Sequence, residues 1–247
     1  MTELSPLMTV FAATFAWHRA RITFLAQFLV ALVRVRTVTL TEIAAALCGQ
    51  TKPASSYRRI QRFFQDFSLT RPQIAAAVLQ WLPLGEKWLL CLDRTNWQYG
   101  HQHLNLLVLA VAYHGVALPL LWMSLDKPGA SNSHERIALL KHFLCAFDRK
   151  RIRCLTADRE CLGTEWIKFL KRQRIPFRIR LKRNVLVSNP SASSEMAAGR
   201  FFQQCRLGEA YLLPPPRRVF GMTVFVVGMR MKNEFLIIIT NIDPNTA

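Results

Sequence analysis

The sequence is poor in acidic residues. It has 15 Asp and Glu against 33 Lys and Arg in 247 residues, which gives a formal net charge of +18 at pH 7. A charge of this size and sign indicates an acidic substrate or partner. Arginine supplies 24 of the basic residues, and its planar guanidinium matches phosphate oxygens where lysine offers a point charge. The composition therefore favours nucleic acid as that partner.

Long hydrophobic runs and paired cysteines are also missing. The most apolar stretch, 22–33, is broken by Thr23 and Gln27 and is shorter than the ~20 residues that a membrane-spanning helix requires, so it predicts a buried helix. No basic segment precedes Arg19, as a secretory signal would require. The cysteines form no Cys-x-x-Cys pair, which disfavours a zinc site or a disulfide framework. We therefore expect a cytoplasmic protein with a sizeable core and no membrane partner.

The first part of the chain, 1–85, has helical spacing of its apolar residues. Helices are expected over 11–33 and 42–47, followed by a Gly-containing turn and a helix that Ser56 caps. One side of this last helix carries Arg58, Arg59 and Arg62. Two short helices joined by such a turn, the second with an arginine face, are typical of a helix-turn-helix DNA-binding region. A solvated basic face on an ordinary bundle helix explains the same pattern, and both interpretations stay open.

The second part, 86–184, changes to strand patterns. Its expected order is three strands, helix, strand, helix, strand, over 88–92, 104–113, 116–125, 135–147, 151–157, 164–173 and 177–182, with Ser131 or Ser133 as the cap of the helix over 135–147. This order predicts an α/β fold with an RNase H-like mixed sheet and flanking helices. The remainder, 185–247, reads as a β-rich insertion that ends in a hairpin over 218–240. The RNase H-like core would then be incomplete.

Two aspartates stand in matching positions of the predicted sheet. Asp93 follows the apolar strand 88–92, and Asp158 follows the strand 151–157. If these strands are neighbours, both carboxylates project from one edge of the sheet, where they could share Mg²⁺, a cation that prefers oxygen ligands. Such ions stabilise the attacking and leaving oxygens in phosphoryl transfer. The alternative interpretation is that each aspartate only forms a turn or caps a helix.

Positive charge is concentrated around the second aspartate. The segment 149–183 has 13 basic residues against Asp158, Glu160 and Glu165, so it supplies +10 of the net charge. Its strand 177–182 alternates apolar and basic residues, which makes one face of the sheet basic. A face that served solubility alone would mix both signs. The segment therefore predicts contact with a polyanion beside Asp158.

Five segments together resemble a known family. They are Asp-Arg-Thr-Asn-Trp (93–97), Ser-Asn-Ser-His-Glu-Arg (131–136), Ala-Asp-Arg-Glu (157–160), Ile-Arg-Leu-Lys-Arg-Asn (179–184) and Ser-Ser-Tyr-Arg-Arg-Ile-Gln-Arg-Phe-Phe (55–64). In combination they resemble bacterial insertion-sequence transposases of the DDE type, in the group with a β-strand insertion and a Tyr-Arg-Glu-Lys signature. The resemblance covers most of the chain.

The resemblance implies DNA transposition by metal-dependent phosphodiester hydrolysis and strand transfer at insertion-sequence ends. It makes Asp93 and Asp158 the first two catalytic, metal-binding carboxylates, with Mg²⁺ as cofactor and Mn²⁺ as a substitute. Its partners are double-stranded DNA, as terminal inverted repeats and target DNA, and a second copy of the chain in a homodimer. A nucleoid-associated location in the bacterial cytoplasm follows. The expected DNA-binding residues are Arg58, Arg59, Arg62, Arg94, Arg159, Arg178, Arg180, Lys182 and Arg183.

The sequence departs from the family at the third carboxylate. The family places that glutamate on a helix within its Tyr-Arg-Glu-Lys signature, which does not occur here, so we expect a truncated and catalytically impaired chain. Glu160 fits a structural role better than that of a substitute, and Glu165, Glu195, Glu209 and Glu234 lack a helical Arg/Lys context. Cys161 stands where the family has an aromatic residue. Trp97 could stack a base or only pack.

Two other functions remain open at this stage. One is a non-catalytic DNA-binding protein that inhibits transposition by occupying element ends. The other is a structure-specific nuclease with the same core, which would cut branched DNA without needing its own terminal sequence.

Overall fold

The computed structural model describes residues 4–47, 52–188 and 194–243. The chain divides into two compact units, Met1–Thr70 and Arg71–Ala247. Each unit is described by itself. The helical region that the sequence predicted to reach residue 85 thus divides at Thr70, because the next helix packs on the sheet of the second unit.

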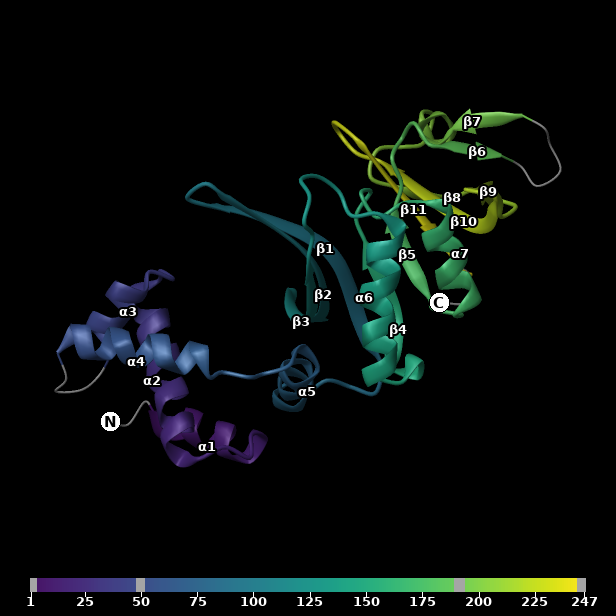
Figure 1. Ribbon diagram of the computed structural model, residues 1–247. Coiled ribbons are helices and arrows are strands. Elements are labelled where there is room, and N and C mark those ends of the chain that lie inside the picture. Colours follow the sequence, from purple (N-terminus) through teal and green to yellow (C-terminus); the bar gives the residue numbers. More distant parts are fainter. Residues whose placement is uncertain (1–3, 48–51, 189–193, 244–247) are drawn as a thin grey trace. The chain divides into compact units, whose positions relative to one another are not determined.

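The N-terminal unit is helical (Figure 1). Its helices are α1 (Leu4–Thr14), α2 (Arg19–Val35), α3 (Leu40–Ala46) and α4 (Pro53–Gln65). Apolar side chains from three of them form a core that includes Phe24, Phe28, Ile43 and Ile60. The stretch 22–33 lies within α2, where alternate residues are buried against this core and against α1.

Helix α4 begins earlier than the sequence predicted. Pro53 occupies its first turn, because a proline there loses no helical hydrogen bond and already has a helical φ angle. Ser56 is therefore a buried residue inside the first turns, 4% exposed, and not the N-cap. The expected arginine face is present: Arg58, Arg59 and Arg62 are exposed. Gly49, expected in the turn before α4, lies outside the described residues.

No described helix is by itself long and apolar enough to span a membrane. Helices α2 and α3, which meet at an angle of 108°, pass that test only as a bent pair, by length and composition.

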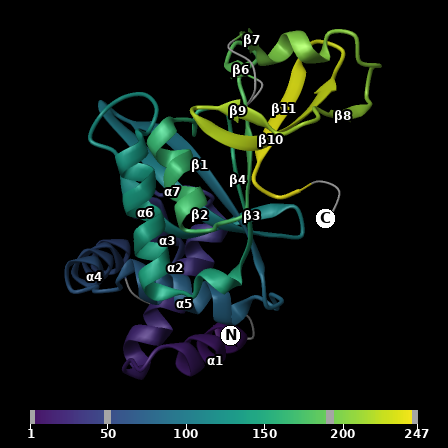
Figure 2. The same ribbon diagram turned by 90° about the vertical axis from the view of Figure 1, so that its right-hand side faces the viewer.

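Among its described residues, the second unit is a mixed α/β structure around an 11-stranded sheet (Figures 1 and 2). The strand order is β3-β2-β1-β4-β5-β11-β10-β9-β6-β7, with β8 paired to β10. The strands are β1 (Trp88–Tyr99), β2 (Gln102–Tyr113), β3 (Val116–Ser124), β4 (Ile152–Ala157), β5 (Phe177–Arg180), β6 (Leu186–Ser188), β7 (Glu195–Ala197), β8 (Ala210–Leu212), β9 (Arg217–Val219), β10 (Met222–Arg230) and β11 (Phe235–Thr240).

Strands β1, β2 and β3 form the expected antiparallel meander, and β4 and β5 run parallel to β1. The helices α6 (Ser133–Ala146) and α7 (Thr164–Arg172) lie side by side against one face of this sheet (Figures 1 and 2). That face is apolar because alternate strand residues such as Leu90, Leu92 and Leu109 point to it and are buried with side chains of both helices. The helix α5 (Arg71–Trp81) packs on β3.

Strand β1 is longer than the sequence predicted. The apolar run ends at Leu92, but pairing with β2 continues through Trp97↔Leu104 to the end of the strand. The far ends of β1 and β2 extend beyond the last paired residue of β3, Ser124, as a two-stranded hairpin (Figure 1). The length of β1 is set by its pairing with β2, which the run of apolar residues in the sequence does not indicate.

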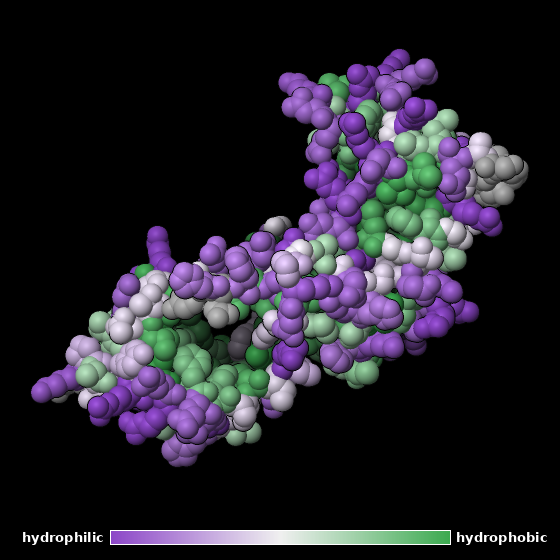
Figure 3. Space-filling model, turned by 45° about the horizontal axis from the view of Figure 1, so that its top comes forward, coloured by the Kyte–Doolittle hydropathy of each residue, from purple (hydrophilic) through white to green (hydrophobic). Residues whose placement is uncertain are grey.

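The β-rich insertion continues the same sheet. Strand β11 pairs antiparallel with β5, with Ile239 opposite Ile179, so the hairpin of β10 and β11 extends the sheet beyond β5. The short 3-10 helix η2 (Ala198–Phe202) packs beneath β10, where the Phe202 ring lies against the backbone of Gly228. Hydrophilic side chains dominate the surface visible in Figure 3, with smaller apolar patches between them.

Candidate functional site

Two aspartates follow the paired ends of neighbouring parallel strands. The pairing of β1 with β4 ends at Leu92↔Ala157, and the next residues are Asp93 and Asp158. Asp93 lies within β1, since that strand continues along β2, whereas Asp158 begins the turn after β4. Both residues are exposed. The register therefore brings these two carboxylates, far apart in sequence, to the same edge of the β1–β4 pair.

Arg94 is held by three side-chain contacts next to Asp93. Its Nε lies 3.1 Å from Oε2 of Glu160 and its Nη2 3.4 Å from Oε1, so the two side chains pair through two hydrogen bonds. Its Nη1 donates to Oδ1 of Asn105 at 3.3 Å. The backbone N–H of Arg94 donates to Oδ1 of Asp93 at 2.8 Å. Arg94 therefore connects β1 with the turn after β4, and its guanidinium is already occupied.

Asn105 is a buried polar residue that supports Arg94 from β2. Its Nδ2 donates to the carbonyls of Lys127 at 2.7 Å and Gly129 at 3.0 Å. With its Oδ1 accepting from Arg94, the amide satisfies its polar atoms in a site where an unpaired group would be costly. The loop 127–129 is thereby fixed to the sheet edge.

Asp158 faces a basic residue of the next strand. Nη1 of Arg180 on β5 lies 3.9 Å from Oδ1 of Asp158, and Nη2 lies 2.5 Å from Oε2 of Glu234. All three side chains are partly exposed, so solvent screens these ion pairs. Arg180 thus lies between the candidate site and the hairpin of β10 and β11.

The turn that carries Asp158 is fixed from beneath by a buried arginine. Arg136 on α6 is 3% exposed and donates to the Leu162 carbonyl at 2.8 Å, to Ser131 Oγ at 3.0 Å and to the Ser131 carbonyl. Burial of the guanidinium lowers the pKa of Arg136. These contacts connect the start of α6 to residues 158–163.

The segment 131–136 also shapes the start of α6. Asn132 is the N-cap and Glu135 completes a capping box with it, in place of the Ser131 or Ser133 cap that the sequence predicted. Asparagine at this position accepts from the Glu135 N–H, and Glu135 accepts from the Asn132 N–H. Burial raises the pKa of Glu135, but the hydrogen bonds from Lys127 and from the Asn132 N–H together outweigh this effect. The pKa of Glu135 is therefore below its usual value.

Cys161 lies in the turn that follows Asp158. Its backbone N–H donates to the Asp158 carbonyl at 2.9 Å, and its side chain is buried. Burial is the largest cause that raises the pKa of this thiol to about 11, and the negative charges of Asp93, Glu160 and Asp158 raise it further against the opposing effect of Arg136. A buried thiol thus stands three residues after Asp158 in this turn.

The remaining predicted basic residues lie in two places. Arg159, Arg178, Lys182 and Arg183 are exposed in the second unit, and β5 alternates as expected, with Phe177 and Ile179 buried. The arginines of α4 belong to the N-terminal unit; among them, Arg59 lies over the Phe24 ring at 4.5 Å. Sequence reasoning missed Arg136 and Asn105 as supporting residues, although the 131–136 motif contains the first of them.

The two aspartates fit a hard divalent cation. Among residues 4–47, 52–188 and 194–243, no group of three or more His, Cys, Asp and Glu side chains could hold a metal ion. Mg²⁺ is commonly bound through only one or two carboxylates, with water and substrate phosphates completing its coordination. Asp93 and Asp158 present exposed carboxylate oxygens of that kind, and neither is sealed in a buried salt link.

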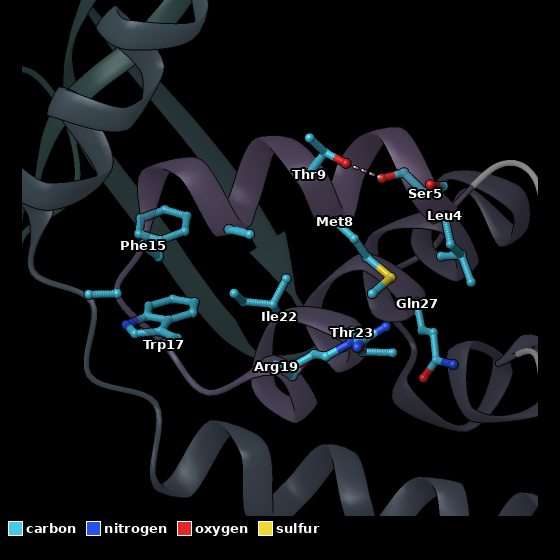
Figure 4. A pocket seen from close by; sticks show the side chains of 12 residues that line it. Leu4, Ser5, Met8, Thr9, Phe15, Trp17, Arg19, Ile22, Thr23 and Gln27 are labelled. Carbon is cyan, nitrogen blue, oxygen red and sulfur yellow. Dashed lines mark hydrogen bonds between the residues drawn. The ribbon is translucent and has the colours of Figure 1, made fainter.

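The N-terminal unit contains a separate apolar pocket between α1 and α2. It has a volume of about 1010 Å³, and Met8, Phe15, Trp17 and Ile22 line it together with polar side chains such as Thr23 and Gln27 (Figure 4). None of the predicted site residues lines this pocket.

Comparisons with known proteins give only distant likenesses. No family model matches the sequence, and no curated protein matches it. Among solved structures, the chain is similar to a chain of the simian T-cell lymphotropic virus intasome in complex with PP2A regulatory subunit B56 gamma, at 11% identity and a TM-score of 0.32, over 87% of this chain and 99% of that one. It is also similar to endonuclease V from Bacillus subtilis, at 7% identity and a TM-score of 0.30, over 77% of each chain.

Proposed function

We propose that this chain processes DNA through a DDE-type, RNase H-like core in which Asp93 and Asp158 hold Mg²⁺, or Mn²⁺ in its place, against a phosphodiester. The observation that supports this most is the β1–β4 register, which ends one residue before each aspartate. The strand order β3-β2-β1-β4-β5, with β2 antiparallel to its neighbours, also supports the proposal of an RNase H-like core.

The chain's own residues divide the work in this proposal. A bound metal ion supplies charge stabilisation for the attacking and leaving oxygens. Asp93 and Asp158 position the metal, and the contacts of Arg94, Glu160 and Arg136 keep their two segments in place. The exposed basic side chains of β5 and the following turn attract the phosphate backbone.

The resemblance of the sequence extends the proposal to transposition. The substrates would be double-stranded insertion-sequence ends and target DNA, and the chain would act as a homodimer that brings two ends together. Hydrolysis at the end of the element would release a 3′-hydroxyl, which then attacks a phosphodiester of the target.

Nicking of DNA by aspartate variants tests this proposal. The substrate is a labelled duplex that carries the inverted repeat flanking the gene, and the assay compares Mg²⁺, Mn²⁺ and EDTA. We expect Asp93→Asn and Asp158→Asn each to lower nicking at least about 100-fold, because even loss of an outer partner of a metal ligand costs ~10–100-fold. Asp126→Asn is the matched control, since Asp126 is an exposed aspartate outside the pair. Equal nicking by all three variants would contradict the proposal.

A second candidate is DNA binding without cleavage, as in an inhibitor of transposition. It is favoured by the finding that the described residues bring no third acidic side chain to the two aspartates as a metal-binding group. The same assay separates the two functions. The inhibitor would bind the inverted-repeat duplex and block nicking by a complete enzyme, while wild-type protein alone would nick in neither Mg²⁺ nor Mn²⁺.

A further inference from the structure

Strands β1, β2 and β3 form a groove next to Asp93, on the face of the sheet opposite to the buried Leu90 and Leu92. Its volume is about 420 Å³, within the range of ~300–1,000 Å³ typical of small-molecule pockets. Residues of a strand alternate between its two faces, so the positions of β1 that alternate with the buried Leu90 and Leu92 point into this groove. They are Cys91, Asp93, Thr95 and Trp97.

The floor of the groove and its β3 side are apolar. Leu106, Val108 and Ala110 of β2 form the floor, and Ala117, Pro119 and Trp122 of β3 line the far side. This part of the groove suits the flat, apolar face of a ring.

Trp97 stands at the end of the groove with an unusual exposure. It is 62% exposed, opposite the 42% exposed Leu104, on the part of the hairpin beyond the β3 pairing. It also lines a second, more polar pocket, with Arg94, His103 and Lys127 around it. A tryptophan that served only packing would be buried, so its ring is available to a ligand from both pockets.

Charges beside the groove suit a phosphate linkage. Arg94 lines the groove and also borders the neighbouring polar pocket together with Lys127. Asp93, to which the proposed function assigns a metal ion, lines the groove itself. A ligand of this groove would therefore have an apolar ring over the strands and anionic groups beside it. An unpaired nucleotide of a DNA strand has this chemistry.

We propose that the groove binds an unpaired nucleotide of the strand being processed, with its base stacked on Trp97 and against the apolar floor. The inference rests on the proposed function, because it places the base beside the carboxylate that holds the metal. Recognition by stacking tolerates every base, since each has an aromatic face. The groove thus selects single-stranded over paired DNA without reading sequence.

Binding of fluorescein-labelled oligothymidine, measured by anisotropy in EDTA, tests the proposal. We expect Trp97→Ala to weaken binding about 5- to 150-fold, which corresponds to the ~1–3 kcal/mol of one stacked base at ~1.4 kcal/mol per tenfold. Trp97→Phe, which keeps an aromatic face, should recover most of that affinity. Binding to the same probe annealed to oligoadenine should change for neither variant.

Trp81→Ala is the matched control, because Trp81 is a 40% exposed tryptophan of the same unit that lines no part of the groove. Thermal unfolding followed by circular dichroism shows whether each variant is folded. Equal affinities of the folded Trp97→Ala and Trp81→Ala variants for oligothymidine would overturn the proposal. So would a Trp97→Ala variant that loses self-association and keeps DNA affinity, since the groove would then be an interface between copies.

The experiment is independent of the proposed function. Because EDTA removes divalent cations, stacking on Trp97 is measured without the metal that Asp93 would hold. If Trp97→Ala keeps both metal-dependent nicking and its affinity for oligothymidine, the proposal that the groove binds a nucleotide is refuted, and the proposed function is not. Loss of nicking in the aspartate variants, conversely, says nothing about Trp97.

Discussion

The buried Arg136 provides the sharpest test of how the Asp158 turn is held. The residue is 3% exposed, and its guanidinium donates to two acceptors of Ser131 and to the carbonyl of Leu162. Replacement by methionine, Arg136→Met, keeps the unbranched stem of the side chain and removes every donor. The change leaves at least the Leu162 carbonyl without its partner in a partly buried position.

The size of the effect follows from two opposing terms. A hydrogen bond to a charged group contributes ~1.5–3 kcal/mol, but three bonds to one guanidinium are not additive. Burial of that charge is itself unfavourable, as the lowered pKa of Arg136 indicates, and methionine removes this cost. We therefore expect the free energy of unfolding to fall by about 2–4 kcal/mol, which lowers the melting temperature of a unit of this size by roughly 5–15 °C.

Chemical denaturation followed by circular dichroism measures this loss, and the nicking assay measures its consequence for Asp158. Lys141→Met is the control, because Lys141 is an exposed basic residue of the same helix. Arg136→Lys should give an intermediate loss, since one ammonium cannot reach acceptors on both sides of the guanidinium. If Arg136→Met loses less than ~1 kcal/mol relative to Lys141→Met, the clamp between α6 and the 158–163 turn does not exist as described.

Two further predictions concern buried groups of the second unit. The Cys161 thiol, with its pKa raised to about 11, should be alkylated by iodoacetamide at about pH 8 far more slowly than the exposed Cys145, as followed by mass spectrometry. Because the folded pKa exceeds the unfolded value of 9.0, the linked stability is complete below about pH 9 and declines as pH rises toward 11. Gly228→Ala would place Cβ 2.5 Å from the Phe202 ring and should cost ~1–3 kcal/mol of unfolding free energy, whereas Gly85→Ala meets no atom within 4 Å; equal stability of the two variants would refute this.

The sequence predicted the strands and helices whose own pattern is strong. The alternation of 177–182, the meander and the helices over 135–147 and 164–173 are all present with small shifts of their ends. The mixed α/β class is confirmed. Elements set by partners elsewhere in the chain were missed. The length of β1 depends on β2, and the continuation of the sheet from β5 to β11 depends on a pairing between residues about sixty positions apart.

Helix starts show the same limit at a smaller scale. Serine is a good N-cap, so Ser56, Ser131 and Ser133 were each reasonable predictions. The chain instead begins α4 at Pro53 and caps α6 with Asn132, because Pro53 needs no donor and Asn132 forms a reciprocal pair with Glu135. Several residues could cap each helix, and only the surrounding packing selects one of them.

The positions of the two aspartates in the candidate site were predictable from the strands, but the contacts of Arg94 were not. Asp93 and Asp158 were found because each follows an apolar strand, and parallel neighbours must end at one edge. The state of Arg94 was not predictable, since its partner Glu160 is brought near only by that same register. Arg94, a basic residue beside a candidate carboxylate, was thus expected to contact DNA, although its guanidinium already forms three hydrogen bonds, to Glu160 and Asn105.

The β-rich insertion takes part in the site through a single arginine. Pairing of β11 with β5 brings the hairpin residue Glu234 to Arg180, where it is the nearer of two acidic partners, at 2.5 Å against 3.9 Å for Asp158. An arginine bound only to Asp158 would compete with a metal ion for that carboxylate. If Asp158 holds a metal ion as proposed, pairing of Arg180 with Glu234 at the shorter distance would leave the Asp158 carboxylate available to it. The hairpin of β10 and β11 would then contribute to the charge balance at the edge of the sheet, although it lies outside the β1–β4 pair that brings the aspartates together.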